Sequence, residues 1–270
     1  PYHMINIVDI NNLQTIKDAL NKTGFFYIPF RESDKQLISE LMTHCNQLFS
    51  ASDEIKLSYP SHSDGLGFVP LNKQRLNKNK NDMRESYSYR IGQVKNNELY
   101  NKAVTELSYY AKQIFFKILE SLDLNPNDYE EGVMNGFNTL SLAHYPAIKS
   151  DIDKQIYGIS EHCDWGFITL LSTTENGLQV KINDCWVDVP TLDNHFIVNI
   201  GDMLEIISNG KYKSTEHRVL IEKEKYSVIL FFESNLDFIV SPHEVSNKYK
   251  PIKFGDYINK KITESMNLNQ

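Results

Sequence analysis

The sequence has little cysteine, no excess of positive charge and no long hydrophobic run. Its three cysteines, Cys45, Cys163 and Cys185, are odd in number and widely spaced, so they do not indicate a disulfide framework. The formal charge of −7 argues against nucleic acid as a main partner, since phosphate binding needs a basic face. No apolar run approaches the roughly 20 residues of a membrane-spanning helix, and no signal peptide is evident. We therefore expect a cytoplasmic protein, acting as a monomer without nucleic acid or membrane partners.

The pattern of predicted secondary structure changes near the middle of the chain. Residues 4–135 carry strand and helix patterns, residues 136–240 carry many short β-rich runs, and residues 252–266 are again helical. The 270 residues are enough for one large domain or two small ones. We interpret 4–270 as a single domain, a β core packed by helices from both ends of the chain. Residues Pro1–His3, which precede a methionine, are interpreted as a cloning remnant.

The N-terminal half contains the clearest helical pattern. Over 98–122, apolar residues from Val104 to Leu122 recur at spacings of three and four, which predicts a helix with one buried face. A second helix is expected over 34–48, where Ser33 and Gln36 have the spacing of a capping box. Strands are expected at Ile5–Val8 and Gly24–Ile28, and an exposed loop at Asn72–Asp82.

Beyond about residue 138, short runs rich in β-branched and aromatic residues alternate with turn residues. Asn176-Gly177 and Asn209-Gly210 are strong turn signals between such runs. Many short strands at roughly ten-residue spacing predict an antiparallel sandwich or barrel. The predicted strands are Thr139–Tyr145, Phe167–Ser172, Leu178–Ile182, Phe196–Ile200, Met203–Ile207, Glu216–Ile221 and Tyr226–Phe232.

One short motif has the spacing of a metal site. On a strand, His162 and Asp164 would point to the same face, so an imidazole nitrogen and a carboxylate oxygen would converge. A third ligand from another strand would complete a two-histidine, one-carboxylate triad with open positions for oxygen chemistry on Fe(II). Alone, this pattern is equally consistent with an ordinary hydrogen-bonded histidine. Cys163, between the two ligands, would point away, which disfavours a zinc–thiolate site.

An ordered series of segments surrounds this motif. The segments are Ile5–Ile10, Gly24–Tyr27, Gly67–Leu71, Arg84–Tyr87, His144–Pro146, His162–Leu171, Gly177–Val180, Trp186–Pro190, Asn199–Asp202, Ser208–Ser214 and His217–Val219. In this series the chain resembles the isopenicillin N synthase-like family of Fe(II)/2-oxoglutarate-dependent oxygenases over almost all of residues 4–265. The resemblance implies a mainly β fold with flanking α-helices around a double-stranded β-helix (jelly-roll) core. It also implies Fe(II) and 2-oxoglutarate as cofactors, and His217 as the third ligand beside His162 and Asp164.

The chain departs from the family at the site for 2-oxoglutarate. An Arg-x-Ser pair on a late strand binds the distal carboxylate in the family, and the matching place here reads Lys225-Tyr226-Ser227. Lysine supplies a compact charge without the planar fork of arginine. The resemblance assigns the distal carboxylate to Lys225 and Ser227, with a hydroxyl added by Tyr145. If Lys225 does not serve, Arg218 is the next candidate, although it neighbours a ligand and adjacent strand residues face opposite ways.

These features predict an Fe(II)- and 2-oxoglutarate-dependent dioxygenase that uses O2 to oxidise a C–H bond of a small organic substrate. Hydroxylation, desaturation or cyclisation would accompany formation of succinate and CO2. The alternatives are an Fe(II) oxidase of the same family that uses no 2-oxoglutarate, and a silent binding protein on the same scaffold; succinate formation and iron-dependent oxygen consumption discriminate them. Candidate substrate contacts, from the resemblance alone, are Arg90, Tyr87, Trp165 and Phe231.

Overall fold

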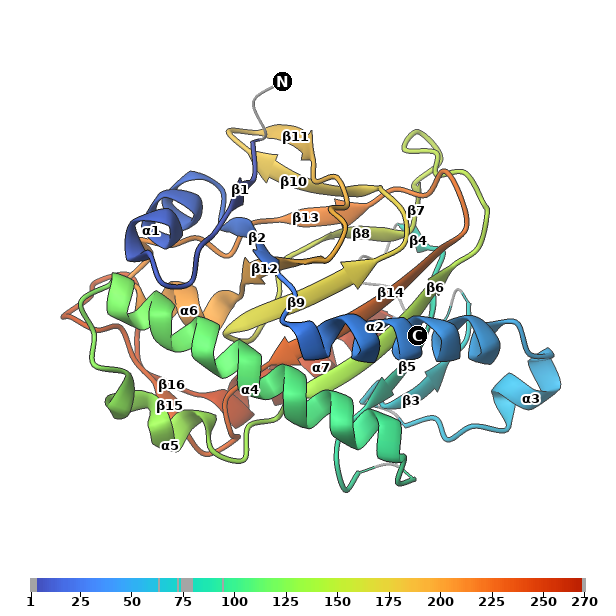
Figure 1. The fold of residues 1–270 in the computed structure, drawn as a ribbon, viewed down its shortest axis with the longest axis horizontal. Coiled ribbons are helices and arrows are strands. Elements are labelled where there is room, and N and C mark those ends of the chain that lie inside the picture. Colours follow the sequence, from blue (N-terminus) through green and yellow to red (C-terminus); the bar gives the residue numbers. More distant parts are fainter. Residues whose placement is uncertain (1–3, 63, 72, 74–79, 94, 269–270) are drawn as a thin grey trace.

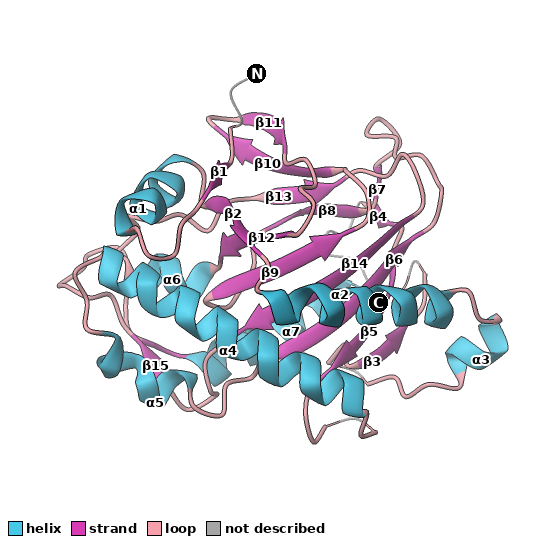
Figure 2. Cartoon of the chain, in the orientation of Figure 1, coloured by secondary structure: helices cyan, strands magenta, loops and turns pink. Residues whose placement is uncertain are grey.

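Two β-sheets form the centre of the protein in a computed structural model that describes residues 4–268 except 63, 72, 74–79 and 94 (Figures 1 and 2). The larger sheet has eight strands in the order β1 (Asn6–Ile7), β2 (Phe25–Pro29), β12 (His195–Ile200), β9 (Ile168–Thr173), β14 (Lys225–Phe232), β6 (Thr139–Tyr145), β5 (Glu85–Tyr89) and β3 (Gly67–Val69). The smaller sheet has the order β11 (Cys185–Asp188), β10 (Leu178–Ile182), β13 (His217–Val219) and β8 (Ile159–His162). Apart from the parallel pair β1–β2, neighbouring strands in both sheets are antiparallel.

Helices and two small strand pairs complete the described part of the chain. The helices are α1 (Leu13–Lys22), α2 (Glu32–Phe49), α3 (Asp53–Leu57), α4 (Glu98–Ser121), a 3₁₀ helix (Pro126–Tyr129), α5 (Glu130–Val133), α6 (Asp202–Ile207) and α7 (Phe254–Leu268). The pairs are β4 (Asn81–Asp82) with β7 (Ile156–Tyr157) and β15 (Ile239–Val240) with β16 (Ile252–Lys253). No helix in these described ranges combines the length and hydrophobicity that crossing a membrane requires.

Helices α2 and α4 lie across the outer face of the larger sheet (Figure 1). The buried face of α4 carries the spaced apolar residues that predicted it, so the helix expected over 98–122 is confirmed. Phe115 lies at the centre of this layer, stacked on Phe167 with ring centroids 4.4 Å apart and tilted against Phe232 at 5.9 Å. Each large apolar side chain buried here contributes about 1.5–3 kcal/mol, which holds the helices against the sheet.

Alternation along β14 divides its side chains between two cores. Val228 and Leu230 face the helices, whereas Ile229 faces the second core, shared with residues of the smaller sheet such as Val180 and Val219. The odd-numbered residues of β14 therefore point between the two sheets. This register decides which residues of β14 face the interior where the functional site is built.

The mainly β fold with a jelly-roll core is confirmed, and six of the seven strands predicted beyond residue 138 are present. The strand predicted at Met203–Ile207 is wrong, because this stretch forms helix α6. A run of five residues is too short for its periodicity to distinguish strand from helix. Asn209 and Gly210, with φ of 52° and 76°, adopt the left-handed conformation that ends a helix, so the expected hairpin turn is a helix C-terminus.

Three expectations for the N-terminal half differ from the structure or lie outside its described residues. The capping box predicted at Ser33 and Gln36 is wrong: α2 begins after Arg31, whose backbone N–H donates to the Asp34 carboxylate at 2.8 Å. The exposed loop predicted at Asn72–Asp82 lies mostly outside the described residues, and its end, Asn81–Asp82, forms β4. Residues 1–3, predicted to be a cloning remnant, also lie outside them.

Candidate metal centre and adjoining cavity

Three side chains from separate positions converge at one end of the smaller sheet. His162 ends β8, His217 begins β13 directly opposite it in register, and Asp164 follows β8 by two residues. One ligand atom from each lies within 4.8 Å of the others, and no other such group of three or more His, Cys, Asp or Glu occurs in the described part of the chain. The Nε2 atoms of His162 and His217 lie 3.7 and 3.6 Å from Asp164 Oδ1. These separations are too long for hydrogen bonds and leave space for a common ligand.

Asp164 is not on a strand, contrary to the reasoning from the His-x-Asp spacing. Strand β8 ends at His162, and Asp164 is turned inward by hydrogen bonds instead of by strand alternation. Its Oδ2 atom accepts from the Thr169 hydroxyl at 2.6 Å and from the Asn199 amide at 2.7 Å. Both donors belong to the larger sheet, and the bonds leave Oδ1 directed at the two histidines.

The two histidines are held in the tautomer that a metal ligand needs. Nδ1 of His162 contacts the Ser160 carbonyl at 2.9 Å, and Nδ1 of His217 contacts the Thr215 carbonyl at 3.0 Å. A carbonyl can only accept, so Nδ1 carries the proton and Nε2 presents a lone pair. Burial, with the neighbouring His217, lowers the pKa of His162 to about 3, which favours the neutral ring. A set of two imidazole nitrogens and one carboxylate oxygen fits Fe(II) with open positions.

Cys163 and His144, two further residues whose side chains can bind metals, are engaged in other contacts. The Cys163 thiol donates to the Ser214 carbonyl at 3.4 Å, and burial raises its pKa to about 12, so it is a poor thiolate ligand. His144 is held between Glu85 and Glu224 at 2.7 and 2.9 Å.

Lys225 is a buried cation with no carboxylate in direct contact among the described residues. It begins β14 directly opposite Tyr145 of β6, is 2% exposed, and places Nζ 5.6 Å from the Tyr145 ring centroid. No described carboxylate lies within 4.0 Å of Nζ, and burial lowers the pKa of Lys225 to about 8. Ser227, two residues along the same face, hydrogen-bonds the Thr173 hydroxyl at 2.9 Å.

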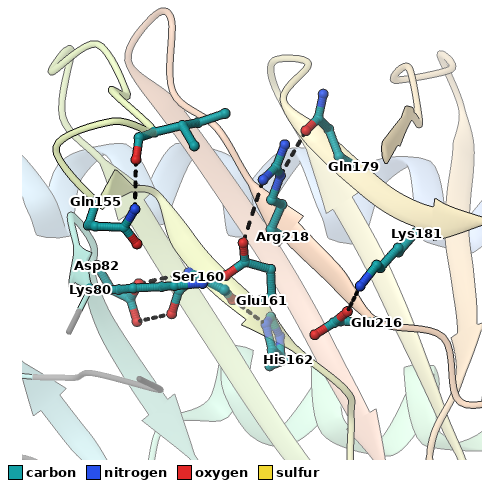
Figure 3. A network of polar contacts seen from close by, with 11 residues as sticks. Lys80, Asp82, Gln155, Ser160, Glu161, His162, Gln179, Lys181, Glu216 and Arg218 are labelled. Carbon is teal, nitrogen blue, oxygen red and sulfur yellow. Dashed lines mark hydrogen bonds and ion pairs between the residues drawn. The ribbon is translucent and has the colours of Figure 1, made fainter. Parts of the chain in front are cut away.

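Arg218, the alternative cation, faces the other side of the smaller sheet. Its Nε donates to the Gln179 side chain at 2.9 Å, its Nη1 lies 3.5 Å from Glu161, and it stacks over Trp186. Figure 3 shows Arg218 and Glu161 together on one side of the strands, with the His162 ring on the other. Arg218 is therefore excluded as the partner of an anion at the metal centre.

Arg84 is a residue near the centre to which the sequence analysis assigned no role. It lies one residue before β5, lines the cavity, and hydrogen-bonds the Tyr145 side chain. The charge of Arg84 acts on both Tyr145 and His162. The Tyr145–Lys225 pair and the metal centre therefore lie on the same side of the larger sheet, close to Arg84. Only its position before Glu85-Ser86-Tyr87, in a segment that the family resemblance already included, could have marked it.

A cavity of about 600 Å³ adjoins the metal centre, with His162 and Asp164 in its wall. Arg90, Trp165 and Phe231 line it, together with α7 residues and the segment before β3, and their contact with a substrate stays a prediction. Tyr87 does not belong to its described lining. Strand alternation turns Tyr87 toward the helices, where it packs against Tyr59 and Tyr100.

Comparisons with known proteins agree with this geometry. The family model described as the 2OG-Fe(II) oxygenase superfamily matches residues 137–234, and the model described as non-haem dioxygenase in morphine synthesis N-terminal matches residues 9–110. Together the matches take in most of the chain. The chain belongs to the 2OG-Fe(II) oxygenase superfamily, in its isopenicillin N synthase-like branch. It is a 2-oxoglutarate-dependent dioxygenase whose cofactors are Fe(II) and 2-oxoglutarate.

Individual relatives are distant or partial. A kihadalactone A synthase from Citrus sinensis is 39% identical over 153 residues, which are 51% of this chain and 46% of that protein. A homoarginine-6-hydroxylase from Glycine max is 26% identical, over 93% of this chain and 88% of that protein. A full-length Neurospora crassa protein, crystallised in complex with alpha-KG and thymine, superposes with a TM-score of 0.84 at 21% identity, over 96% of both chains.

Proposed function

We propose that His162, Asp164 and His217 hold the Fe(II) of this oxygenase. The observation that carries the assignment is the convergence of three ligand atoms, one from each side chain. The other polar atom of each side chain is already hydrogen-bonded: Nδ1 of each histidine to a carbonyl, and Oδ2 of Asp164 to two donors. Such outer contacts orient ligands and raise their basicity. Among the described residues they leave one atom of each ligand without a hydrogen bond and facing the other two, as a resident metal requires.

We propose further that Lys225, Ser227 and Tyr145 bind the distal carboxylate of 2-oxoglutarate. A dicarboxylate held beside a metal in a buried site needs a cation to offset its lost hydration. Lys225 supplies an ammonium that has no carboxylate partner among the described residues. Ser227 of β14 and Tyr145 of β6 supply hydroxyls from the face of the larger sheet that carries Lys225. Arg84 hydrogen-bonds the Tyr145 side chain. Because arginine can only donate, the Tyr145 hydroxyl would keep its own proton available for the carboxylate.

The cavity of about 600 Å³ is the proposed substrate site. Its size suits a small organic molecule, and Trp165, Phe231 and α7 contribute apolar wall. The chain's part is to hold one C–H bond near the metal and to exclude water. When bound, Fe(II) and 2-oxoglutarate supply the oxidising chemistry: one oxygen atom of O2 enters succinate, CO2 leaves, and the other atom oxidises the substrate.

The proposal also covers the cellular compartment and the oligomeric state. The three cysteines are free thiols, which supports a reducing compartment such as the cytoplasm. A monomer is proposed for the oligomeric state, and light scattering of the purified protein tests it. One relative is named for homoarginine and one structural neighbour holds thymine, and both are small organic molecules, the general class that we propose for this cavity.

The experiment is an oxygen-free titration of 2-oxoglutarate into the Fe(II) protein, following the metal-to-ligand absorption band. Asp164→Ala is expected to lose iron and the band while retaining the fold, and His195→Ala, a control outside the centre, is expected to keep both. Full iron occupancy in Asp164→Ala would refute the ligand assignment. Turnover of a substrate without succinate would instead favour the oxidase alternative.

A further inference from the structure

Glu233 is a buried carboxylate in the cavity wall with no assigned role. It follows the last residue of β14, is 7% exposed, and lines the same cavity as His162 and Asp164. Its backbone N–H donates to the Asn138 side chain at 2.8 Å. Its carboxylate forms no hydrogen bond and no ion pair within 4.0 Å with any residue that the structure describes.

The backbone opposite is adapted to this side chain. A Cβ atom added at Gly166 would lie 2.7 Å from Glu233 Cγ and 3.0 Å from the Phe232 carbonyl. Gly166 follows Trp165, which lies in the cavity wall, so the absence of a side chain at 166 gives Glu233 its place beside the metal centre. The carboxylate is therefore built into the wall and is not an exposed group turned inward.

The positive charge that acts on Glu233 is already shared. Arg90 acts on Glu233 through its charge, but its Nε donates to Thr139 at 2.8 Å and its Nη1 lies 3.3 Å from Asp64. Its guanidinium also stacks on Phe137, 3.6 Å from the ring centroid. One guanidinium thus serves two carboxylates, of which Asp64 takes the direct contact.

An ionised carboxylate in this position is costly until something donates to it. Burial raises the pKa of Glu233 to about 8; Arg90 opposes the shift, and the charge of Asp164 adds to it. A ligand with a positive charge would remove this penalty, because it would supply both the missing donor and the missing charge. A ligand carboxylate would face two carboxylates in addition to Arg90.

We propose that Glu233 binds a protonated nitrogen of the substrate, so that the substrate class is a small amine or guanidine with an apolar body. This inference rests on the proposed function, since it takes the cavity beside the metal centre as the substrate site. The apolar walls at Trp165 and Phe231 receive the body of the molecule. Glu233 is thereby a specificity-determining residue that fixes one end of the substrate.

The test compares hexylguanidinium with its neutral isostere hexylurea, and with hexanoate. Each is titrated by calorimetry, without oxygen, into the Fe(II) protein kept saturated with 2-oxoglutarate, at a pH equal to the pKa of about 8 of Glu233. The parent is expected to bind hexylguanidinium at least about tenfold more tightly than hexylurea, as for a hydrogen bond between charged groups. In Glu233→Gln this preference should disappear, in Glu233→Asp it should persist in weaker form, and the exposed control Glu54→Gln should match the parent.

Other outcomes overturn the inference. It fails if neither probe binds, if both bind alike in the parent, if hexanoate binds best, or if Glu233→Gln keeps the full preference. The 2-oxoglutarate absorption band of the parent is recorded in the same samples. Absence of that band contradicts the proposed function, whereas a normal band without a charge preference contradicts only the role of Glu233.

Discussion

Replacing Lys225 by methionine should stabilise the ligand-free protein and weaken its binding of 2-oxoglutarate. Methionine keeps most of the length of the lysine side chain and removes the ammonium. Because Lys225 is 2% exposed and has no described carboxylate partner, its charge is a cost to folding until an anion arrives. The same charge is what a bound dicarboxylate would use.

The size of this cost follows from the pKa of Lys225, which burial lowers from 10.5 to about 8. At about 1.4 kcal/mol per pKa unit, the charged form costs about 3 kcal/mol. The unfolded chain binds more protons between pH 8 and 10.5, so stability of the ligand-free protein rises with pH in that window. Below about pH 8 the full cost applies, and Lys225→Met should recover it.

Two measurements check this prediction. Urea unfolding at neutral pH, without metal or 2-oxoglutarate, should give Lys225→Met a free energy of unfolding up to about 3 kcal/mol above that of the parent. Anaerobic titration of the Fe(II) protein should show 2-oxoglutarate bound about 2–5 kcal/mol more weakly. The exposed Lys223→Met is the matched control and should change neither value. A Lys225→Met protein that unfolds more easily and binds 2-oxoglutarate like the parent would refute the reasoning.

Three further predictions concern the donors to Asp164, the pH dependence of 2-oxoglutarate binding and the helix layer. Thr169→Val together with Asn199→Leu should weaken iron binding about 10–100-fold, measured by competition with a chelator, because both donors orient Asp164. The affinity for 2-oxoglutarate should fall as pH rises through about 8, where the Lys225 ammonium is lost, and Lys225→Arg should remove this dependence if it binds at all; a flat parent profile would contradict it. Phe115→Ala should lower the free energy of unfolding by about 3–5 kcal/mol in urea titrations, and a loss below about 1 kcal/mol would show that the helix layer is not held there.

Local patterns carried much of the fold. The spacing of apolar residues over 98–122 predicted α4 because one face of that helix is buried along its whole length. Alternation in β14 placed Lys225 and Ser227 on one face, and the pairing with β6 then put Tyr145 opposite Lys225. For long elements with a regular spacing of apolar residues, such as α4 and β14, the sequence was sufficient to predict the element and its buried face.

Long-range contacts were beyond such patterns. The orientation of Asp164 depends on Thr169 and on Asn199, which lies 35 residues further along the chain. No rule based on local spacing could predict this orientation. The surroundings of Glu233 depend on Gly166, which leaves room for it, and on Arg90, whose charge is shared with Asp64. These three residues come from three other segments. The sequence was therefore enough to predict which residues would meet at the proposed metal and 2-oxoglutarate sites, but not the charges in the wall of the adjoining cavity.

The positions of the three proposed ligands predict that the metal would also stabilise the fold. His162 and His217 belong to the smaller sheet, whereas Asp164 is tied by Thr169 and Asn199 to the larger one. A bound ion would thus cross-link the two sheets at one end of the sandwich. Iron bound only by the folded state adds to stability in proportion to the logarithm of its concentration over its dissociation constant. Amide hydrogens of β8 and β13 should consequently exchange faster after chelation, while those of α4 remain slow, so the end that admits substrate would also be the end that opens first.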